Sequence, residues 1–307
     1  MSAKNWLKFI LLGTIWGSSF LWIKIALQEV GPITLVVFRA GFATLGLLVV
    51  ALVTRPKIRK EDIWILAVLA FFNVTVPFVL ISWSETHISS GMASILNSTV
   101  PLFTILIAPV VLAEERLTGR RIVGLLVGFA GVIVLMSNQL SSTDSLKMVG
   151  VVTMLIAACS YAISGIFARK MKRAIRPTAQ SLGQMGMAVL FVTPAALTFE
   201  APFHFPTLPM TYLALLWLGL LGSCAGTLRW FSLVNSVGPT RTSMTTYLFP
   251  LVGVLLGSAF LGEQVDWRLI AGGILIILAV VVVNTQKAPA VETGLQNKVN
   301  DLEQEND

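Results

Sequence analysis

The sequence predicts an all-α integral membrane protein with ten transmembrane helices, arranged as two inverted five-helix repeats. Three observations lead there. The first is composition: 55% of the 307 residues are hydrophobic and 12% are charged, whereas soluble domains average about 25% charged residues. The second is a series of apolar runs, each near the roughly 20 residues that cross a bilayer as a helix. The third is a polar, proline-containing segment that occurs twice.

The apolar runs follow one another with short linkers, which leaves no room for a large domain outside the membrane. Pro32 suits the first turn of the second run, and the third run contains Asn73. The expected spans are 6–27, 32–53, 63–84, 91–115, 122–136, 148–168, 178–199, 211–233, 242–264 and 269–284. The remaining tail is polar and lacks an apolar period, so we expect residues 287–307 to be a disordered cytoplasmic tail.

Lysine and arginine set the expected orientation. With ten spans, 17 of the 22 basic residues fall on the side of the N-terminus, and only Lys24, Lys147 and Arg268 fall on the other. Cytoplasmic loops of membrane proteins are enriched in these residues. We therefore expect a multi-pass protein of the cell membrane with both termini in the cytoplasm. The net charge of +7 reflects this topology and does not indicate a nucleic-acid partner.

The internal repeat divides the chain into residues 1–144 and 145–286. The segment GMASILNSTVPLFTILIAPVVLAEE (91–115) has a counterpart in TSMTTYLFPLVGVLLGSAFLGEQ (242–264), with Pro250 149 residues after Pro101 and Glu263 149 residues after Glu114. Earlier in each half, WGSSFLWIK aligns with YAISGIFAR at an offset of 145. Five spans per half is an odd number, so the second half must enter the membrane from the opposite side. Such repeats typically enclose a central substrate site and permit alternating access.

Several of these segments resemble a known family. WGSSF, the block from SETHISSGMASILNSTVP to GLLVGFAGVIVL, and the echo VGPTRTSMTTYLFPLVGVLLGSAFLGEQ are similar to the EamA-type branch of the drug/metabolite transporter superfamily. The resemblance implies ten helices, an exporter-like role for small metabolites or drugs, and a central cavity. It places the fifth and tenth helices at the periphery, where a homodimer could form. The chain departs from the family pattern at Ser84, Glu85 and Thr86, which predicts a more acidic outer rim.

The two mid-span prolines are candidate hinges. A proline inside a helix removes a backbone hydrogen bond, and the freed carbonyl needs a protein or water partner within a membrane. Pro101 and Pro250 therefore mark either a hinge with a substrate-facing carbonyl or a kink that only shapes packing. Asn97, one turn before Pro101, is either a recognition group in a cavity or a partner in an interhelical hydrogen bond.

Aromatic and polar residues within the spans supply the other candidate substrate-binding positions. Aromatic rings in a cavity favour amphipathic or aromatic solutes, although the same rings also serve as membrane packing. The residues that could either line a cavity or serve in packing are Trp16, Asn73, Trp83, Tyr161 and Tyr247.

Two arginines lie inside spans, where charge is costly. Arg39 could bind a substrate carboxylate or pair with Glu85 or Glu29, but a long side chain that reaches the outer surface is the simpler interpretation. Arg229, near the inner end of its span, is interpreted in the same way. We expect Glu114 to pair with Arg120 or Arg121 and Glu263 to pair with Arg268. No carboxylate is expected deep within a span.

The sequence favours a secondary transporter, and the resemblance implies that it exports its substrates. The substrates would be small organic metabolites such as amino acids or drug-like amphipathic compounds. The alternatives are a non-transporting membrane scaffold or a channel. We expect no enzyme activity, no cofactor and no metal site, because no nucleophile–base set or metal-ligand spacing is evident.

Overall fold

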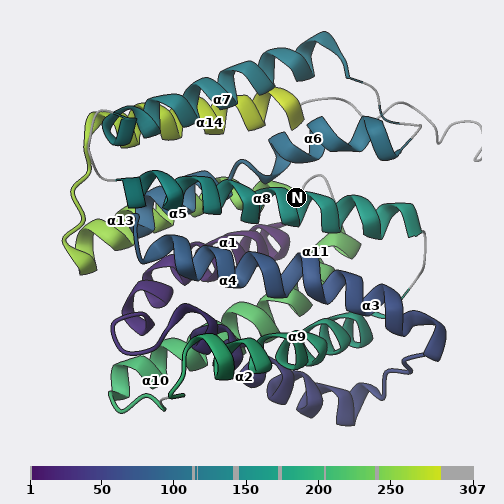
Figure 1. Cartoon of the computed structure of the whole chain (residues 1–307). Coiled ribbons are helices and arrows are strands. Elements are labelled where there is room, and N and C mark those ends of the chain that lie inside the picture. Colours follow the sequence, from purple (N-terminus) through teal and green to yellow (C-terminus); the bar gives the residue numbers. More distant parts are fainter. Residues whose placement is uncertain are drawn as a thin grey trace, which may run out of the picture.

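The computed structural model describes residues 2–112, 115, 117–140, 145–171, 175–203, 205–238 and 242–284. Helices make up all of the regular structure in these ranges (Figure 1). The first half contains α1 (Ala3–Ala26), α2 (Pro32–Thr54), η1 (Lys60–Asp62), α3 (Ile63–Ala70), η2 (Phe71–Thr75), α4 (Val76–Glu85), α5 (Ser90–Asn97), α6 (Val100–Val111) and α7 (Gly119–Leu140). The second half contains α8 (Ser145–Met171), α9 (Pro177–Phe199), α10 (Pro209–Leu216), η3 (Trp217–Ala225), α11 (Gly226–Val237), η4 (Met244–Tyr247), α13 (Leu248–Leu261) and α14 (Trp267–Asn284).

Nine helical stretches among the described residues are long and apolar enough to cross a membrane. They correspond to the first nine expected spans, and the apolar stretch Trp267–Val282 within α14 is shorter. The prediction of an all-α membrane protein is confirmed. The expected tail, 287–307, lies outside the described residues.

Interruptions divide several spans. The third span consists of α3, the π-helical turn η2 and α4, and the eighth consists of α10, the π-helical η3 and α11. The fourth is split into α5 and α6, and the ninth begins with the 3₁₀ turn η4. Helices in lipid must satisfy their backbone groups internally, and they are interrupted only where neighbouring protein groups or a polar interior supply partners.

Helix α1 packs along α13 in the middle of the bundle. A β-carbon built on Gly13 would lie 2.4 Å from Leu248, and one built on Gly17 would lie 2.8 Å from Val252. Only glycine permits this close approach. Side chains on the outside of the bundle are instead large and apolar, such as Val53 and Val110, which are each 85% exposed. This surface suits lipid.

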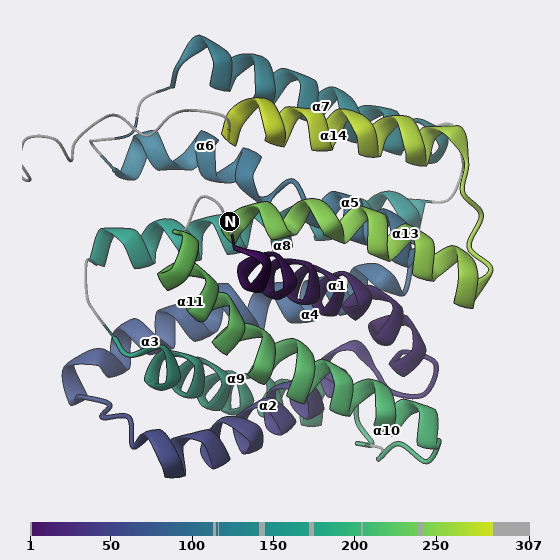
Figure 2. The ribbon, with the colours of Figure 1, turned by 180° about the vertical axis from the view of Figure 1, so that it is seen from behind.

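Helices α7 and α14 lie side by side at one edge of the bundle in both views (Figures 1 and 2). They cross where a β-carbon on Gly131 would be 2.9 Å from the carbonyl oxygen of Gly272. Close crossings at small residues are typical of membrane helices. The peripheral position expected for the fifth and tenth helices is therefore observed, with their glycines packed within one chain.

Carboxylates cap helices at the end of the bundle that carries the 27–31 and 200–208 loops. Glu200 accepts hydrogen bonds from the backbone nitrogens of Ile33 and Thr34, each 2.8 Å long, at the start of α2. Glu29 accepts from the hydroxyl and backbone nitrogen of Thr207, next to the start of α10. The Thr207 hydroxyl is the main cause that lowers the pKa of Glu29 from 4.5 to about 2.

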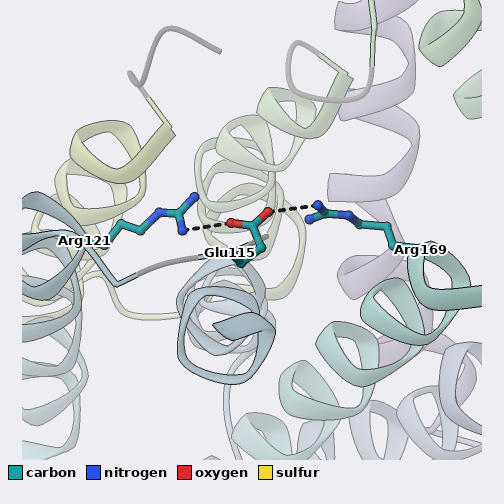
Figure 3. A network of polar contacts seen from close by, with 3 residues as sticks. All are labelled: Glu115, Arg121 and Arg169. Atoms are coloured by element: carbon teal, nitrogen blue, oxygen red, sulfur yellow. Dashed lines mark hydrogen bonds and ion pairs between the residues drawn. The ribbon is translucent and has the colours of Figure 1, made fainter. Parts of the chain in front are cut away.

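The opposite end of the bundle contains an ion-pair network (Figure 3). Glu115 lies 2.8 Å from Arg121 at the start of α7 and 2.9 Å from Arg169 near the end of α8. Burial alone would raise the pKa of Glu115, but the hydrogen bonds from the two arginines outweigh it and lower that pKa. The network ties the linker after α6 to two other helices.

Candidate functional site

The two interrupted helices of the repeat meet at their interruptions. The Ser98 hydroxyl, in the gap between α5 and α6, lies 3.1 Å from the carbonyl oxygen of Ser94 and 3.3 Å from that of Thr246 in η4, and it shares its one hydrogen between these two acceptors. In a regular helix that carbonyl would accept from the nitrogen of residue 250, which is a proline and has no N–H. At the end of η4 the Thr246 carbonyl also accepts from a backbone N–H, so the contact with Ser98 joins the two halves in addition to this local bond.

The structure refines the expected hinge positions. Pro101 lies in the first turn of α6, and Pro250 is the third residue of α13. Neither proline kinks a continuous α-helix. Each begins a new helical segment, where the missing N–H costs little. Whether these positions move remains a prediction.

Asn97 is the last residue of α5, beside this junction. It is 8% exposed, and its side-chain oxygen Oδ1 is buried without a hydrogen-bond partner. The expected interhelical bond through this oxygen is not observed. A buried amide oxygen without a partner costs free energy, so Asn97 retains unused capacity to accept a hydrogen bond.

The two π-helical turns are bound by the central helices α1 and α8. The Trp16 indole nitrogen donates to the carbonyl oxygen of Gly222 in η3 at 2.8 Å. The Ser160 hydroxyl donates to the carbonyl oxygen of Phe72 in η2, also at 2.8 Å. Widened helical turns leave carbonyls to be satisfied from outside and are frequent at functional sites.

A second pair of hydrogen bonds joins these turns to α2 and α9. The Arg39 Nε donates to the Ser223 hydroxyl at 3.0 Å, and the Asn73 amide donates to the Gln184 side chain at 2.9 Å. Arg39 and Gln184 are 145 residues apart, the offset of the repeat in this part of the chain. The two bonds are thus counterparts between the halves.

The expectation that Arg39 reaches the surface is wrong. The residue is 7% exposed, and its guanidinium carbon lies 3.8 Å from the centre of the Phe78 ring. The bond to Ser223 and the stacking on Phe78 hold the side chain between α2, α4 and η3. Arg229, by contrast, is exposed on α11, as the surface interpretation predicts.

The aromatic candidates occupy different places. Trp16 stacks against Trp230 with ring centres 5.5 Å apart and meets Phe249 edge-on at 6.2 Å. This aromatic cluster lies beside η3, near the site. Tyr161, on α8, is close enough to the Arg39 charge to interact with it electrostatically.

Trp83 and Tyr247 have structural partners. Trp83 lies near the end of α4 and stacks on His87 at 4.3 Å. The Tyr247 hydroxyl donates to the carbonyl oxygen of Val280 in α14 at 3.1 Å. The structure therefore brings Trp16, Arg39, Asn73 and Tyr161 onto the helices around the two π-helical turns, places Asn97 at the neighbouring junction, and gives Trp83 and Tyr247 contacts away from these turns.

Glu85 is a residue whose role the sequence did not reveal. It was expected at an acidic rim, but it is 0% exposed, and neither carboxylate oxygen has a hydrogen-bond partner. Lys24 donates to the backbone carbonyls of Glu85 and Ile88, the latter at 2.7 Å. The expectation of an acidic outer rim at this position is therefore wrong: Glu85 is the last residue of α4, at the end of its span, and its side chain is buried.

Glu263 does not pair with Arg268. It accepts from the backbone nitrogens of Ser90 and Gly91 at 2.6 and 3.0 Å and from the Ser90 hydroxyl at 3.0 Å. Arg268 instead lies 3.9 Å from Asp266. A carboxylate at a helix N-terminus complements the helix dipole, which makes the start of α5 a better partner than a half-exposed arginine. Glu114 lies outside the described residues.

Among the described residues, no group of three or more His, Cys, Asp and Glu side chains could hold a metal ion.

Comparison with known proteins identifies the family. The EamA-like transporter family matches the chain twice, over residues 5–137 and 148–285. The chain belongs to this family of membrane transporters.

Relatives of this EamA-like transporter cover nearly the whole chain. An "Uncharacterized transporter" of Archaeoglobus fulgidus is 25% identical over 91% of this chain and 98% of its own length. A "Probable amino-acid metabolite efflux pump" of Salmonella typhimurium is 28% identical over 90% and 93%. A "Probable terminal-alkyne amino-acid exporter" of Streptantibioticus cattleyicolor is 28% identical over 90% and 91%. A crystal structure with 16% identity matches 92% of this chain and 96% of that chain with a TM-score of 0.65, which supports the fold.

Proposed function

We propose that this EamA-like transporter is a secondary exporter of small organic metabolites, amino acids foremost, that works by alternating access. The observation that carries the proposal is the junction of two interrupted helices, joined by the bond from Ser98 to the Thr246 carbonyl. Polar, broken helices that meet inside a membrane protein are the usual frame of a transporter substrate site. The buried, unpartnered oxygen of Asn97 lies at this junction.

Alternating access rests on ten helices in two inverted repeats, residues 1–144 and 145–286. The two matches to the family support this arrangement. So do the counterpart bonds of Arg39 and Gln184, and the π-helical turns, which fall in the third and eighth spans. We propose that each half rocks against the other about the junction, with Pro101 and Pro250 as hinges.

The substrate class follows from the side chains around the junction. A buried arginine favours a carboxylate, and the aromatic cluster around Trp16 favours an apolar or aromatic side chain. An amino acid carries both features, and two of the relatives above are named for amino-acid export. The cavity residues proposed are Trp16, Arg39, Asn73, Asn97 and Tyr161. Trp83, Arg229 and Tyr247 are further candidates that lie farther from the π-helical turns.

We place the protein in the cell membrane with both termini in the cytoplasm, on the distribution of lysine and arginine. The end that carries Lys24 and Glu263 then faces outward. A homodimer through the lipid-facing sides of α7 and α14 is compatible with exposed residues such as Leu126 and Ile274.

The test is transport by purified protein in liposomes. Liposomes are loaded with a mixture of isotope-labelled amino acids, and the compounds released are measured by mass spectrometry. The wild type is expected to release some of them at carrier rates, and Asn97→Ala is expected to slow release at least about tenfold while folding normally. Asn235→Ala, at an exposed position on α11, is the matched control. No release by the wild type, or release at channel rates, would refute the proposal.

A further inference from the structure

The Glu85 carboxylate is the most unusual charged group in the described part of the chain. It is completely buried, and both of its oxygens lack a hydrogen-bond donor. An ionised carboxylate without partners is very costly in a protein interior, so burial favours the protonated, neutral form of Glu85 until a cation arrives. The carboxylate therefore has two oxygens available for a ligand that brings donors of its own.

The charged neighbours of Glu85 do not supply those donors. Lys24, Arg39 and Glu263 all interact with its charge, but none of them forms a hydrogen bond with its oxygens. The Lys24 ammonium is bound to backbone carbonyls, and Glu263 is bound to the start of α5. Of the three guanidinium nitrogens of Arg39, only Nε has a hydrogen-bond partner among the described residues. Its two terminal nitrogens retain their donors.

One face of α4 connects Arg39 with Glu85. Phe78, Ser82 and Glu85 are spaced four and three residues apart, so they share a face of the helix. The guanidinium of Arg39 lies over the Phe78 ring. The Ser82 hydroxyl between them is buried and has no hydrogen-bond partner.

The residues on this face lie within about two helical turns of one another. Seven residues of α-helix rise about 10 Å from Phe78 to Glu85. Side chains on a helix lean toward its N-terminus, so the Glu85 carboxylate leans toward Ser82 and Phe78. Arg39 comes from α2, and its contact with Phe78 places the guanidinium at the end of this face that lies away from Glu85. A positive group, a hydroxyl and a negative group thus follow one another, each with unused hydrogen-bonding capacity.

We propose that Arg39, Ser82 and Glu85 form a head-group site for zwitterionic amino compounds, with the substrate carboxylate on Arg39 and its ammonium on Glu85. This inference rests on the proposed transport function and specifies the substrate's charges. The ammonium supplies the donors that Glu85 lacks, and the carboxylate accepts from the free nitrogens of Arg39. A compound without the ammonium leaves the Glu85 oxygens without a partner, and one without the carboxylate leaves the Arg39 charge without one, so the site favours the zwitterion.

A matched substrate series tests the proposal in liposomes. The probes are L-leucine, 4-methylpentanoate, which lacks the amino group, and isopentylamine, which lacks the carboxylate. The variants are Glu85→Gln and Arg39→Gln, with Glu61→Gln as the control because that glutamate is exposed in η1, at the other end of the third span. Thermal unfolding and gel filtration identify any variant that does not fold, and Ser82→Ala provides a third, milder change at the same face.

In Glu85→Gln, we expect the preference for L-leucine over 4-methylpentanoate to fall at least about tenfold, because a charge-assisted hydrogen bond to the ammonium is lost. Arg39→Gln should lower the preference for L-leucine over isopentylamine in the same way, and Ser82→Ala should weaken L-leucine transport several-fold. Glu61→Gln should leave both preferences and the rate of L-leucine transport unchanged.

Three results would overturn the proposal, and they are distinguishable. If the wild type moves none of the amino acids in the labelled mixture, the transport function itself fails. If it moves amino acids but Glu85→Gln changes no preference, transport stands and the head-group site fails. If Glu85→Gln slows all three probes equally and abolishes the pH dependence of their transport, Glu85 carries a proton and does not bind the ammonium.

Discussion

Replacing Glu263 by alanine should loosen the start of α5. The carboxylate holds two backbone N–H groups, those of Ser90 and Gly91, and the Ser90 hydroxyl. Ser90 is 0% exposed, so water cannot readily replace the lost acceptor. Each buried donor left without a partner costs about 1–3 kcal/mol. With two backbone donors orphaned, Glu263→Ala should lower the free energy of unfolding by about 2–6 kcal/mol.

Glu263→Gln provides an intermediate case. The glutamine oxygen can still accept from one backbone nitrogen, but it loses the charge and the second acceptor. We expect roughly half the loss seen with alanine. Val265→Ala, at a 41% exposed position of the same loop, is the control and should stay within about 0.5 kcal/mol of the wild type.

The assay is reversible unfolding in mixed micelles, followed by tryptophan fluorescence. The expected order of stability is wild type and Val265→Ala first, then Glu263→Gln, then Glu263→Ala. Equal stability of Glu263→Ala and the wild type would show that the cap contributes nothing and would refute this reasoning. A loss of the same size in Val265→Ala would show that the loop is sensitive to any change.

Three further predictions concern other contacts. Gly226→Ala would place a β-carbon 2.5 Å from the Trp16 indole nitrogen. We expect this overpacking to lower the free energy of unfolding by about 1–3 kcal/mol and to impair transport. The control Gly165→Ala, whose β-carbon would have nothing within 4 Å, should be neutral or slightly stabilising. Because the folded-state pKa of Glu29 is lowered to about 2 from 4.5, its contribution to stability is complete above 4.5 and is lost as the pH falls toward 2; Glu29→Gln should flatten this part of an acid-unfolding curve, and an unchanged curve would contradict the assignment. Glu115→Gln should cost about 1 kcal/mol near neutral pH, since Arg169 is half-exposed and its ion pair is screened; a parallel loss in Arg121→Gln, but no additional loss in the double variant, would establish the pairing.

The sequence predicted that the fourth and ninth spans are broken, but not the π-helical breaks in the third and eighth spans, and not how any of the breaks are satisfied. Pro101 and Pro250 were recognisable because proline removes a backbone donor wherever it occurs in a helix. The bond between Ser98 and Thr246 depends on two segments separated by 148 residues, and periodicity along one helix carries no information about which neighbour it meets. The repeat itself was the one signal that linked the two segments.

Arg39, Glu85 and Glu263 illustrate the same difficulty for charged residues. Their positions along the chain put each within a few turns of a span end, where a long side chain normally reaches water. In the structure, Arg39 binds a hydroxyl on η3, and Glu263 binds the start of α5. The Glu85 carboxylate has no hydrogen-bond donor. A polar residue at both repeat positions, Arg39 and Gln184, was the available signal for an interior role.

The turn between α4 and α5 shows why these unexpected contacts belong together. Lys24 binds carbonyl oxygens at the end of α4, and Glu263 binds backbone nitrogens at the start of α5. Each charge complements the dipole of the helix end it meets, so a cation and an anion from two other elements hold the turn from its two sides. The Glu85 carboxylate lies in the same turn of helix that Lys24 caps, and its charge interacts with both Lys24 and Glu263. An ammonium bound to Glu85 would neutralise that charge and weaken its attraction for Lys24, so substrate occupancy and the hold on this turn would be coupled through electrostatics alone. A ligand shifts a conformational equilibrium only by its differential affinity for the two states, and this turn provides a place where such a difference can arise.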